Sequence, residues 1–386
     1  MNPNDFDPDQ RANCQLQLEG YHAFLPPTLP PKLSIDWKLA TLMFEADRAV
    51  AELSGAGRLL PNPHLLIRSY LRREAILSSL IEDTYAEVDE LLLFEVEPST
   101  EPPRASIREV ANHVKALETG LARLTDIPIS SRLIREMHSI LLSTVRGGES
   151  SKTPGEFRRS QNWIGRPGSN LQTATFVPPP PHVIDQLLSG WESYLHAESD
   201  EPDLIKAALL HYQFEAIHPF LDGNGRIGRL LITLFFCARG TLSQPLLYLS
   251  AYFEKYRDEY YQHLLAVSTR GAWQEWLIYF LTGVRDTARN ALADTHAITD
   301  LHQHYRGILD GAKRPPAAAA GVLDALFGSP MLSISGHASR SDESYQNVSK
   351  AIVFWQRHGF VTEMTNQRRN RIFTAPEVLK LTNPKV

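Results

Sequence analysis

A bend between two apolar helices constrains the fold of this chain more than any other feature of its sequence. Residues 203–217 place apolar side chains on one face at helical spacing: Ile205, Ala208, Leu209, Tyr212 and Ala216. After the bend, apolar residues recur three, four, seven and eight positions apart: Ile227, Leu230, Leu231, Leu234 and Phe235. We therefore expect two core helices, the second beginning at about Gly225, joined by a glycine-containing turn.

The turn itself is rich in groups that bind anions. It reads His218-Pro219-Phe220-Leu221-Asp222-Gly223-Asn224-Gly225-Arg226-Ile227-Gly228-Arg229. The glycines let the backbone approach an anion, and successive N–H groups in such a bend form a concave nest. The free N–H groups and the positive dipole end of the next helix add to this attraction. The turn therefore predicts a polyphosphate site.

The side chains of the turn supply the remaining chemistry. Arg226 and Arg229 are three residues apart on the second helix, so both guanidinium groups can clamp phosphate oxygens. Asp222 is a hard oxygen ligand, suited to share Mg²⁺ with a phosphate. His218 ends the first helix and has a pKa range suited to accepting a hydroxyl proton near neutral pH. Together they predict transfer of part of a nucleotide onto a hydroxyl group.

Two other nucleotide-binding motifs are excluded. Residues 223–228 match the pattern G-x-G-x-x-G, but that fingerprint follows a strand and precedes an acidic residue by roughly 20 positions. Here the preceding segment is helical, and no Asp or Glu occurs between Leu230 and Phe253. A P-loop is excluded as well, because no Gly-Lys-Ser/Thr follows the glycines.

Composition sets the wider frame. A chain of 386 residues is expected to form two or three domains, and 43% hydrophobic residues suffice for proper cores. The net charge of −5 gives no global reason for nucleic-acid binding. The two cysteines, Cys14 and Cys237, form no metal or disulfide pattern, and no apolar run approaches the roughly 20 residues of a membrane span. We therefore expect a cytoplasmic protein with no membrane partner.

Most of the chain is predicted to be helical, after a polar and then proline-rich start at residues 1 to about 35 that is expected to be extended or irregular. Helical periodicity covers residues 37–53, 64–94, 107–124, 130–142, 182–196, 254–267 and 272–305. Residues 155–183 contain two strand-like pieces around a turn, which favours a β-hairpin over a long loop.

The C-terminal region has a different pattern. Helices at 317–327 and 339–358 precede strand-like runs at 360–364 and 371–374, which is typical of a winged helix-turn-helix. Its basic residues suit DNA phosphates, but such a module equally serves as a protein-interaction or dimerisation unit. The fold class is therefore mainly α, with a helical core, a small β-hairpin flap and a C-terminal winged helix.

The turn resembles the signature of Fic-domain proteins. The family pattern His-Pro-Phe-x-Asp/Glu-Gly-Asn-Gly-Arg-x-x-Arg is met at every fixed position of residues 218–229. The segments Gly155-Glu156-Phe157-Arg158 and Gln161-Asn162-Trp163-Ile164-Gly165 resemble the family's approach to its flap. The resemblance implies a Fic-type helical fold that transfers AMP from ATP to a Ser, Thr or Tyr hydroxyl of a protein, itself included, and releases pyrophosphate.

The resemblance also implies roles for single residues. His218 is the base, Asp222 holds Mg²⁺, Asn224 helps to orient the nucleotide, and Arg226 and Arg229 hold the remaining phosphates. The ATP-binding stretch runs through the whole set Gly223, Asn224, Gly225, Arg226, Ile227, Gly228 and Arg229. The hairpin at 162–177 is expected to dock the target as an added strand.

Two further expectations come from the resemblance. Gly225 stands where Doc-type toxins, which transfer a phosphoryl group, carry Lys, so AMP transfer is favoured. Tyr256 lies in the region that resembles the part of the family near the base, and is expected to contact the nucleotide.

An inhibitory helix is expected near the N-terminus. Ser78 and Glu82 match the family's Ser/Thr-x-x-x-Glu-Gly/Asn, whereas Asp83 departs from the usual Gly or Asn. A Glu82 carboxylate that reaches Arg229 competes with the ATP γ-phosphate for one guanidinium. In some relatives the same Glu assists removal of AMP, so reverse de-AMPylation is a second expectation.

These expectations divide the chain and leave one alternative open. The predicted domains are an N-terminal helical region with the inhibitory helix (1–103), a catalytic core (104–290), and a linker helix with the winged helix (291–386). The main hypothesis is an autoinhibited protein adenylyltransferase that binds ATP and a protein substrate and forms a homodimer. The alternative is a winged-helix transcriptional regulator whose Fic core senses nucleotide without significant turnover.

Overall fold

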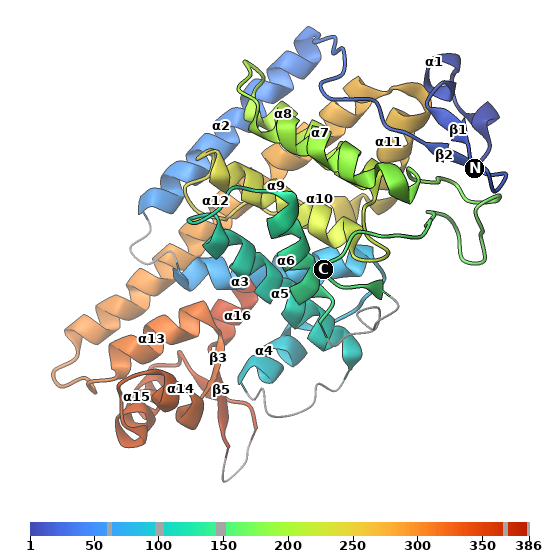
Figure 1. Cartoon of the computed structure of the whole chain (residues 1–386). Helices are drawn as coiled ribbons and strands as arrows, with labels where there is room; N and C mark the ends of the chain where they lie inside the picture. Colours follow the sequence, from blue (N-terminus) through green and yellow to red (C-terminus); the bar gives the residue numbers. More distant parts are fainter. Residues whose placement is uncertain (60–63, 97–103, 144–151, 366–369, 384–386) are drawn as a thin grey trace.

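The computed structural model describes residues 1–59, 64–96, 104–143, 152–365 and 370–383, and it is mainly helical (Figure 1). The helices of its first half are α1 (Pro8–Arg11), α2 (Trp37–Leu59), α3 (His64–Ile81), α4 (Val88–Val96), α5 (Ala105–Arg123), α6 (Ser131–Leu141), α7 (Ile184–His196) and α8 (Asp203–Ile217). Those of its second half are α9 (Asn224–Ala238), α10 (Ser250–Lys255), α11 (Arg257–Arg270), α12 (Trp273–Gly311), α13 (Ala319–Gly328), α14 (Ile334–Arg340), α15 (Tyr345–Arg357) and α16 (Pro376–Thr382). None of the described helices is both long enough and apolar enough to cross a membrane.

Two small antiparallel sheets accompany these helices. β1 (Cys14–Leu16) pairs with β2 (His22–Phe24) near the N-terminus. Near the C-terminus the strand order is β3 (Met331–Ser333), β5 (Ile372–Thr374), β4 (Thr362–Glu363). The helices and the short antiparallel sheets agree with the predicted fold class.

The core is built around the two helices that flank the predicted turn. Almost every side chain of α8 and α9 is buried. Because apolar residues cover more than one face of each helix, both pass through the interior rather than along the surface. Around them, α2 packs along the long α12, while α5 packs against α3 and α6 (Figure 1). This packing holds the turn between α8 and α9 on a rigid support.

Residues 1–35 were expected to be extended or irregular, and they contain the extended strands β1 and β2, but also the short helical segments Pro3–Asp5 and α1, which were not expected. The β1–β2 hairpin is tied to the core by aromatic side chains, because Phe24 stacks with Phe6 and Phe176 at ring-centroid distances of 5.6 and 5.5 Å. The backbone N–H of Asp7 also donates to the Thr269 carbonyl, at 2.8 Å. Tertiary contacts therefore order a segment that is too short and polar to signal this by its own pattern.

The predicted helix at 64–94 is in fact two helices, α3 and α4. Asp83 has a φ of 57°, in the left-handed region. The Thr84 N–H donates to the Ser79 carbonyl, and the Asp83 N–H donates to the Leu80 carbonyl, both at 2.9 Å. These two hydrogen bonds form a Schellman motif, which ends α3 at Ile81 with Glu82 as the C-cap. The apolar stripe continues across this break, so periodicity alone predicted one helix.

Two other predicted helices are also interrupted. The one at 254–267 changes direction at Tyr256, which separates α10 from α11. The one at 339–358 is replaced by α14 and α15, and Ser344 caps α15 by accepting a hydrogen bond from the Asn347 N–H. Tyr256 alone makes the first break, and residues 341–344 make the second, in which Ser341 and Ser344 are both extended. A windowed hydrophobic pattern does not register such short interruptions.

The predicted β-hairpin at 155–183 is reduced to one antiparallel bridge between Ile164 and Phe176. The Asn170 side chain accepts hydrogen bonds from the backbone N–H groups of Gln172 and Thr173, at 2.9 and 3.1 Å. Such local side-chain bonds compete with a strand ladder. The four prolines at 178–181 lack the N–H groups that would extend it.

The C-terminal region consists of α13 to α16 and the β3–β5–β4 sheet, while residues 366–369, at the tip of the predicted wing, lie outside the described residues. Its assignment as a winged helix-turn-helix stays a prediction. The domain boundaries at 103 and 290 also stay predictions, and α12 runs without interruption through the second of them.

Candidate functional site

The turn between α8 and α9 depends on two left-handed backbone positions. His218 caps α8 with φ 50° and ψ 60°, and its N–H donates to the Phe214 carbonyl at 3.0 Å. Gly223, with φ 77°, caps the start of α9. A non-glycine residue in the left-handed region is uncommon and strained. The chain therefore reverses direction within six residues, and the free N–H groups of α9 begin beside His218.

Arg158 stabilises this turn through hydrogen bonds from its guanidinium group. Its guanidinium is buried and donates to four backbone carbonyls: His218 at 2.9 Å, Pro179 at 2.5 Å, Ile217 at 3.4 Å and Ser160 at 3.5 Å. Burial lowers the pKa of Arg158 to about 10, so the group stays charged at neutral pH. The sequence marks Arg158 only as part of a family-like segment and gives no sign that it supports His218.

His138 of α6 forms a second support. The Gly155 N–H donates to its Nδ1 at 2.9 Å, so the ring proton lies on Nε2, which donates to the Asp222 carbonyl at 2.9 Å. The ring stacks on Phe220 at a centroid distance of 3.6 Å. Burial lowers the pKa of His138 to about 4, so it is neutral and keeps this tautomer. No local sequence signal marks this histidine.

Asn224 closes the turn on itself. Its Oδ1 accepts from the Phe220 N–H and its Nδ2 donates to the Phe220 carbonyl, each at 2.8 Å. The side chain is buried. Its expected part in orienting the nucleotide stays a prediction, and in this structure its amide holds the backbone that presents His218.

The His218 ring has the protonation pattern of a general base. Its Nδ1 donates to the Glu215 carbonyl, at 3.3 Å, which leaves a lone pair on Nε2. Burial lowers the pKa of His218 to about 4, and the positive charge of Arg158 lowers it further. The ring is therefore neutral at physiological pH and ready to accept a proton.

Arg226 and Asp222 lie side by side at the start of α9. The buried Arg226 guanidinium contacts Glu109 at 3.3 Å and Asp222 at 3.4 Å. Asp222 accepts a hydrogen bond from the Gly223 N–H at 2.6 Å, while its Oδ2 lies 4.0 Å from Lys152 Nζ. The Asp222 side chain is 36% exposed.

This geometry fits a magnesium ion that is shared with a bound phosphate. Among the described residues, no group of three or more His, Cys, Asp or Glu side chains is arranged to hold a metal. Mg²⁺ in nucleotide sites usually takes one or two carboxylates and completes its shell with phosphate oxygens and water. The half-exposed carboxylate of Asp222, beside the predicted phosphate nest, meets that requirement.

Arg229 is held by the end of α3. Its Nε donates to Ser78 Oγ at 2.8 Å, and its Nη2 donates to the Ser78 carbonyl at 2.7 Å and to Glu82 Oε1 at 3.0 Å. The Glu82 carboxylate also lies against Gly225, where it would overlap any Cβ. The structure thus brings Ser78, Glu82, Gly225 and Arg229 together, and Glu82 occupies the space in front of the nest.

A cavity of about 660 Å³ opens beside these residues. Its walls come from the end of α3, the Ile164–Phe176 bridge, α8, α9 and α11. Tyr260 and Tyr261 line it from α11, and Glu82, Glu215 and Arg229 line it from the other side. Its size falls within the range of roughly 300–1,000 Å³ typical of small-ligand sites.

Tyr256 is not among the residues that line this cavity. It contacts Tyr252 at a ring-centroid distance of 4.9 Å, lies 5.0 Å from Lys255 Nζ, and borders a neighbouring cavity of about 430 Å³. Its nucleotide contact stays a prediction. The aromatic residues that do line the cavity are Tyr260 and Tyr261 of α11.

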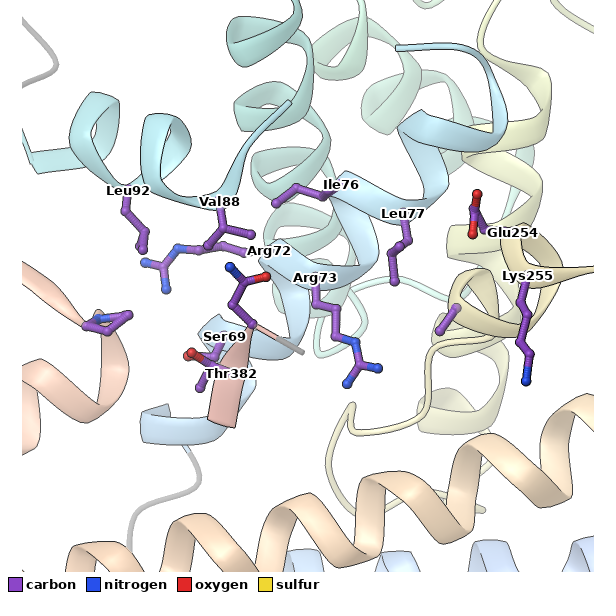
Figure 2. Close-up of a pocket in the computed structure, with 13 residues that line it drawn as sticks. Ser69, Arg72, Arg73, Ile76, Leu77, Val88, Leu92, Glu254, Lys255 and Thr382 are labelled. Carbon is purple, nitrogen blue, oxygen red and sulfur yellow. The ribbon is translucent and has the colours of Figure 1, made fainter. Parts of the chain in front are cut away.

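A third cavity, of about 290 Å³, borders α3 where the C-terminal region meets it (Figure 2). Beside it Arg72 donates to Glu95 of α4, at 2.6 Å from Nη2, and to the Gly328 carbonyl at the end of α13, at 3.0 Å. Arg73 pairs with Asp294 of α12 at 3.2 Å. Arg72 therefore fixes α3, which ends directly before Glu82, to the C-terminal region, and Arg73 fixes the same helix to α12.

Comparison with family models gives two matches. Residues 40–122 match the model described as Fic/DOC family N-terminal, and residues 128–236 match the Fic/DOC family model. The second match includes the whole turn from His218 to Arg229.

The chain is also similar to curated proteins that are named protein adenylyltransferases. A probable protein adenylyltransferase of Aquifex aeolicus is 30% identical over 179 residues, which is 45% of this chain and 50% of that protein. The protein adenylyltransferase Fic of Drosophila melanogaster is 31% identical over 160 residues, 41% of this chain and 28% of that protein. The matched region thus spans half or less of the length of these relatives.

Solved structures show the same fold. A Fic family protein from Desulfovibrio desulfuricans superimposes with a TM-score of 0.56 at 18% identity, over 90% of this chain and 98% of that one. A Fic domain containing signaling protein from Bacteroides thetaiotaomicron gives a TM-score of 0.52 at 18% identity, over 65% of this chain and 95% of that one.

Proposed function

This chain contains a Fic/DOC family domain at residues 128–236, and on that premise we propose that it is a protein adenylyltransferase. It transfers AMP from ATP to a Ser, Thr or Tyr hydroxyl of a protein, itself included, and releases pyrophosphate. The observation that carries this proposal is the neutral His218 at the end of α8, whose Nδ1 is the ring nitrogen that donates and whose Nε2 is left to accept a proton, six residues before the helix α9 that carries Arg226 and Arg229. The relatives named protein adenylyltransferases support it.

The polyphosphate binds at the start of α9. Backbone N–H groups of residues 223–225 face the anion, and Arg226 and Arg229 add charge on the same side. Asp222 is the residue that holds Mg²⁺, which supplies neutralising charge to the phosphates when bound. These groups stabilise the charge that develops on the departing pyrophosphate.

His218 moves the proton in this reaction. The target hydroxyl gives its proton to Nε2 as its oxygen forms a bond to the α-phosphorus. At the same time the bond from the α-phosphorus to the bridging oxygen breaks, and pyrophosphate leaves with that electron pair. Arg158 keeps the His218 backbone in place throughout, because it holds the His218 and Ile217 carbonyls.

Glu82 inhibits the enzyme in the state described here. Its carboxylate neutralises Arg229 and covers Gly225, so it competes with the terminal phosphate of ATP for both. When Glu82 keeps the terminal phosphate away from Arg229, ATP binds in a position from which the hydroxyl cannot reach the α-phosphorus in line. Removal of AMP by the same site is the reverse activity that this arrangement permits.

The target docks at the Ile164–Phe176 bridge. Trp163 and Ile164 are exposed, at 44% and 39%, and the bridge lines the cavity that contains Arg229. An extended target segment can add backbone hydrogen bonds along residues 162–164 and place its hydroxyl in the cavity. Such docking reads the backbone more than the side chains.

A labelling experiment tests this function. The wild type, Glu82→Gly and His218→Ala are incubated with α-labelled ATP and Mg²⁺, and incorporation into the protein is measured. We expect weak self-labelling in the wild type, an increase in Glu82→Gly and none in His218→Ala. Glu87→Gly, which removes another exposed glutamate close in sequence, is the matched control and keeps the wild-type level.

Other outcomes select other functions. Equal labelling in all four proteins contradicts the enzyme and favours a regulator that only senses nucleotide. Incorporation only from γ-labelled ATP indicates phosphoryl transfer instead. The winged helix at the C-terminus and a homodimer belong to the same proposal, with DNA binding the test of the regulatory alternative.

A further inference from the structure

Glu215 is a partly buried carboxyl group that the proposed reaction does not use. It lies on α8, and its side chain lines the cavity that also contains Glu82 and Arg229. Its Oε1 lies directly against Gly228 of α9, so that any side chain at residue 228 would overlap it. Glycine at position 228 thus makes room for this carboxyl group.

The carboxyl group lacks a hydrogen-bond partner. Oε1 is fully buried, and no donor or acceptor among the described residues reaches it. Native proteins pair nearly all of their buried polar atoms, so an unpaired one calls for a specific explanation. Because Oε1 lies against Gly228, it is Oε2, which also has no hydrogen-bond partner among the described residues but is not fully buried, that a ligand in the cavity can reach.

The protonation state of Glu215 determines which ligand this is. Burial raises the pKa of Glu215 to about 8; the charge of Arg229 opposes this rise and that of Glu82 adds to it. The group is therefore a neutral acid at physiological pH, with one O–H to donate. Phosphate oxygens are acceptors only, so a carboxylate repels them whereas a carboxylic acid binds them.

We propose that Glu215 acts as a neutral carboxylic acid that donates a hydrogen bond to the polyphosphate held at Arg229, and that its ionised form opposes nucleotide binding. Glu215 is then a positioning residue for the nucleotide, with a role distinct from that of Glu82. The inference rests on the proposed function only in taking that polyphosphate to be part of ATP.

The tyrosine and histidine groups around Glu215 with shifted pKa values titrate far from pH 8. Burial raises the pKa of Tyr261 to about 12 and lowers the pKa of His211 to about 3 and of His218 to about 4. Burial also raises the pKa of Tyr260 far above its usual value. The remaining charged residues of the cavity are Glu82, Asp83, Arg166, Arg229, Arg257 and Asp258. A change in binding between pH 7 and pH 9.5 is therefore assigned to Glu215.

The test measures binding rather than turnover. In the full chain carrying Glu82→Gly, calorimetry gives the dissociation constant of a non-hydrolysable ATP analogue from pH 6.5 to 9.5, with and without Glu215→Gln. We expect the dissociation constant to rise above pH 8, approaching about tenfold per pH unit, when Glu215 is present. With Gln, which stays neutral and still donates, we expect a flat profile.

Glu74→Gln is the matched control. Glu74 is also fully buried, and burial likewise raises its pKa, but it accepts a hydrogen bond from Ser250 and borders a different cavity. We expect this variant to keep the alkaline loss of binding. Identical pH profiles for the Glu215 and Gln proteins would overturn the proposal, as would failure to bind the analogue at any pH.

A second measurement covers the case in which Glu215→Gln does not fold. Titrations of the Glu82→Gly protein at pH 8.5, in two buffers of different ionisation enthalpy, report protons taken up on binding. We expect uptake of a fraction of one proton, because a nearby phosphate favours the protonated acid. No uptake contradicts the proposal. Since neither measurement requires AMP transfer, a protein that binds as expected without labelling itself would refute only the proposed function.

Discussion

Asp83 forms an ion pair with Arg257, with 2.8 Å between Oδ1 and Nη1, while its backbone is in the left-handed region at φ 57°. That backbone conformation explains why the family prefers Gly or Asn at this position, and Asp is the next best residue there. The departure noted in the sequence is therefore compatible with the inhibitory helix. The side chain links the end of α3 to α11, across the cavity that Glu82 enters.

Replacing Asp83 with Asn tests this link. The variant keeps a residue that tolerates the left-handed conformation but loses the charge that pairs with Arg257. Because Asp83 is 82% exposed, the pair is weak, and self-labelling is expected to rise by only about two- to fivefold. The control is Arg270→Gln. Arg270 lies on α11, like Arg257, and the change breaks its exposed pair with Glu275 of α12, so we expect no effect. Lower labelling in Asp83→Asn would contradict the link.

The pH profile of AMP transfer should have two limbs. For kcat/KM of the Glu82→Gly protein, activity is lost on the acid side near pH 4, where the base His218 becomes protonated. Activity is lost on the alkaline side near pH 8, where the acid Glu215 ionises. The Glu215→Gln variant is expected to lose only the alkaline limb. An acid limb near pH 6.5 would show that burial does not lower the pKa of His218.

Arg158→Lys should separate positioning from binding. Lysine keeps the positive charge but cannot reach four carbonyls at once. We expect kcat to fall by about one to two orders of magnitude with little change in the KM for ATP, and stability to fall by about 2 kcal/mol. Arg159→Lys, at the exposed neighbouring position that pairs with Glu156, serves as the control. A change confined to KM would argue that Arg158 binds the nucleotide instead.

Arg72→Met should weaken the attachment of α3, the proposed inhibitory helix, to α4 and α13. Arg72 is buried and joins α3 to Glu95 and to the Gly328 carbonyl, so its loss is expected to cost about 1–3 kcal/mol of stability. Self-labelling should rise as well, because α3 is then held less firmly. Arg68 lies on α3 like Arg72, and Arg68→Met removes its exposed pair with Glu118 of α5. This variant is expected to change neither stability nor self-labelling. Thermal unfolding and the labelling assay measure both, and reduced stability with unchanged labelling would refute the coupling.

Much of the site was accessible from the sequence because its residues are close together in the chain. The bounds of α8 were predicted to the residue, and α9 begins one residue earlier than expected. Both helices have strong apolar periodicity, and the turn between them is marked by glycines. Their positions follow from local rules alone.

The supports of the site were not accessible in this way. Arg158 and His138 act on residues 60 and 84 positions away, and neither lies in a pattern that announces such contacts. The end of α3 depends on one backbone angle at Asp83, inside a stripe of apolar residues that continues beyond it. Long-range hydrogen bonds and single dihedral angles are set by the tertiary structure, which propensity and periodicity do not encode.

The position of Glu82 in the Schellman motif at the end of α3 determines how fast the proposed inhibitory contact with Arg229 can open. Glu82 and Asp83 are exposed and follow the last residue of α3, whereas Ser78, Ser79 and Ile81 in the last turn of that helix are buried, so residues 82–84 can open while α3 stays in place. Local opening of such a short segment takes well under a millisecond and costs far less than global unfolding. Release of Arg229 is then a local fraying event, and backbone amides of residues 82–84 should exchange hydrogen with solvent long before those of α8 and α9.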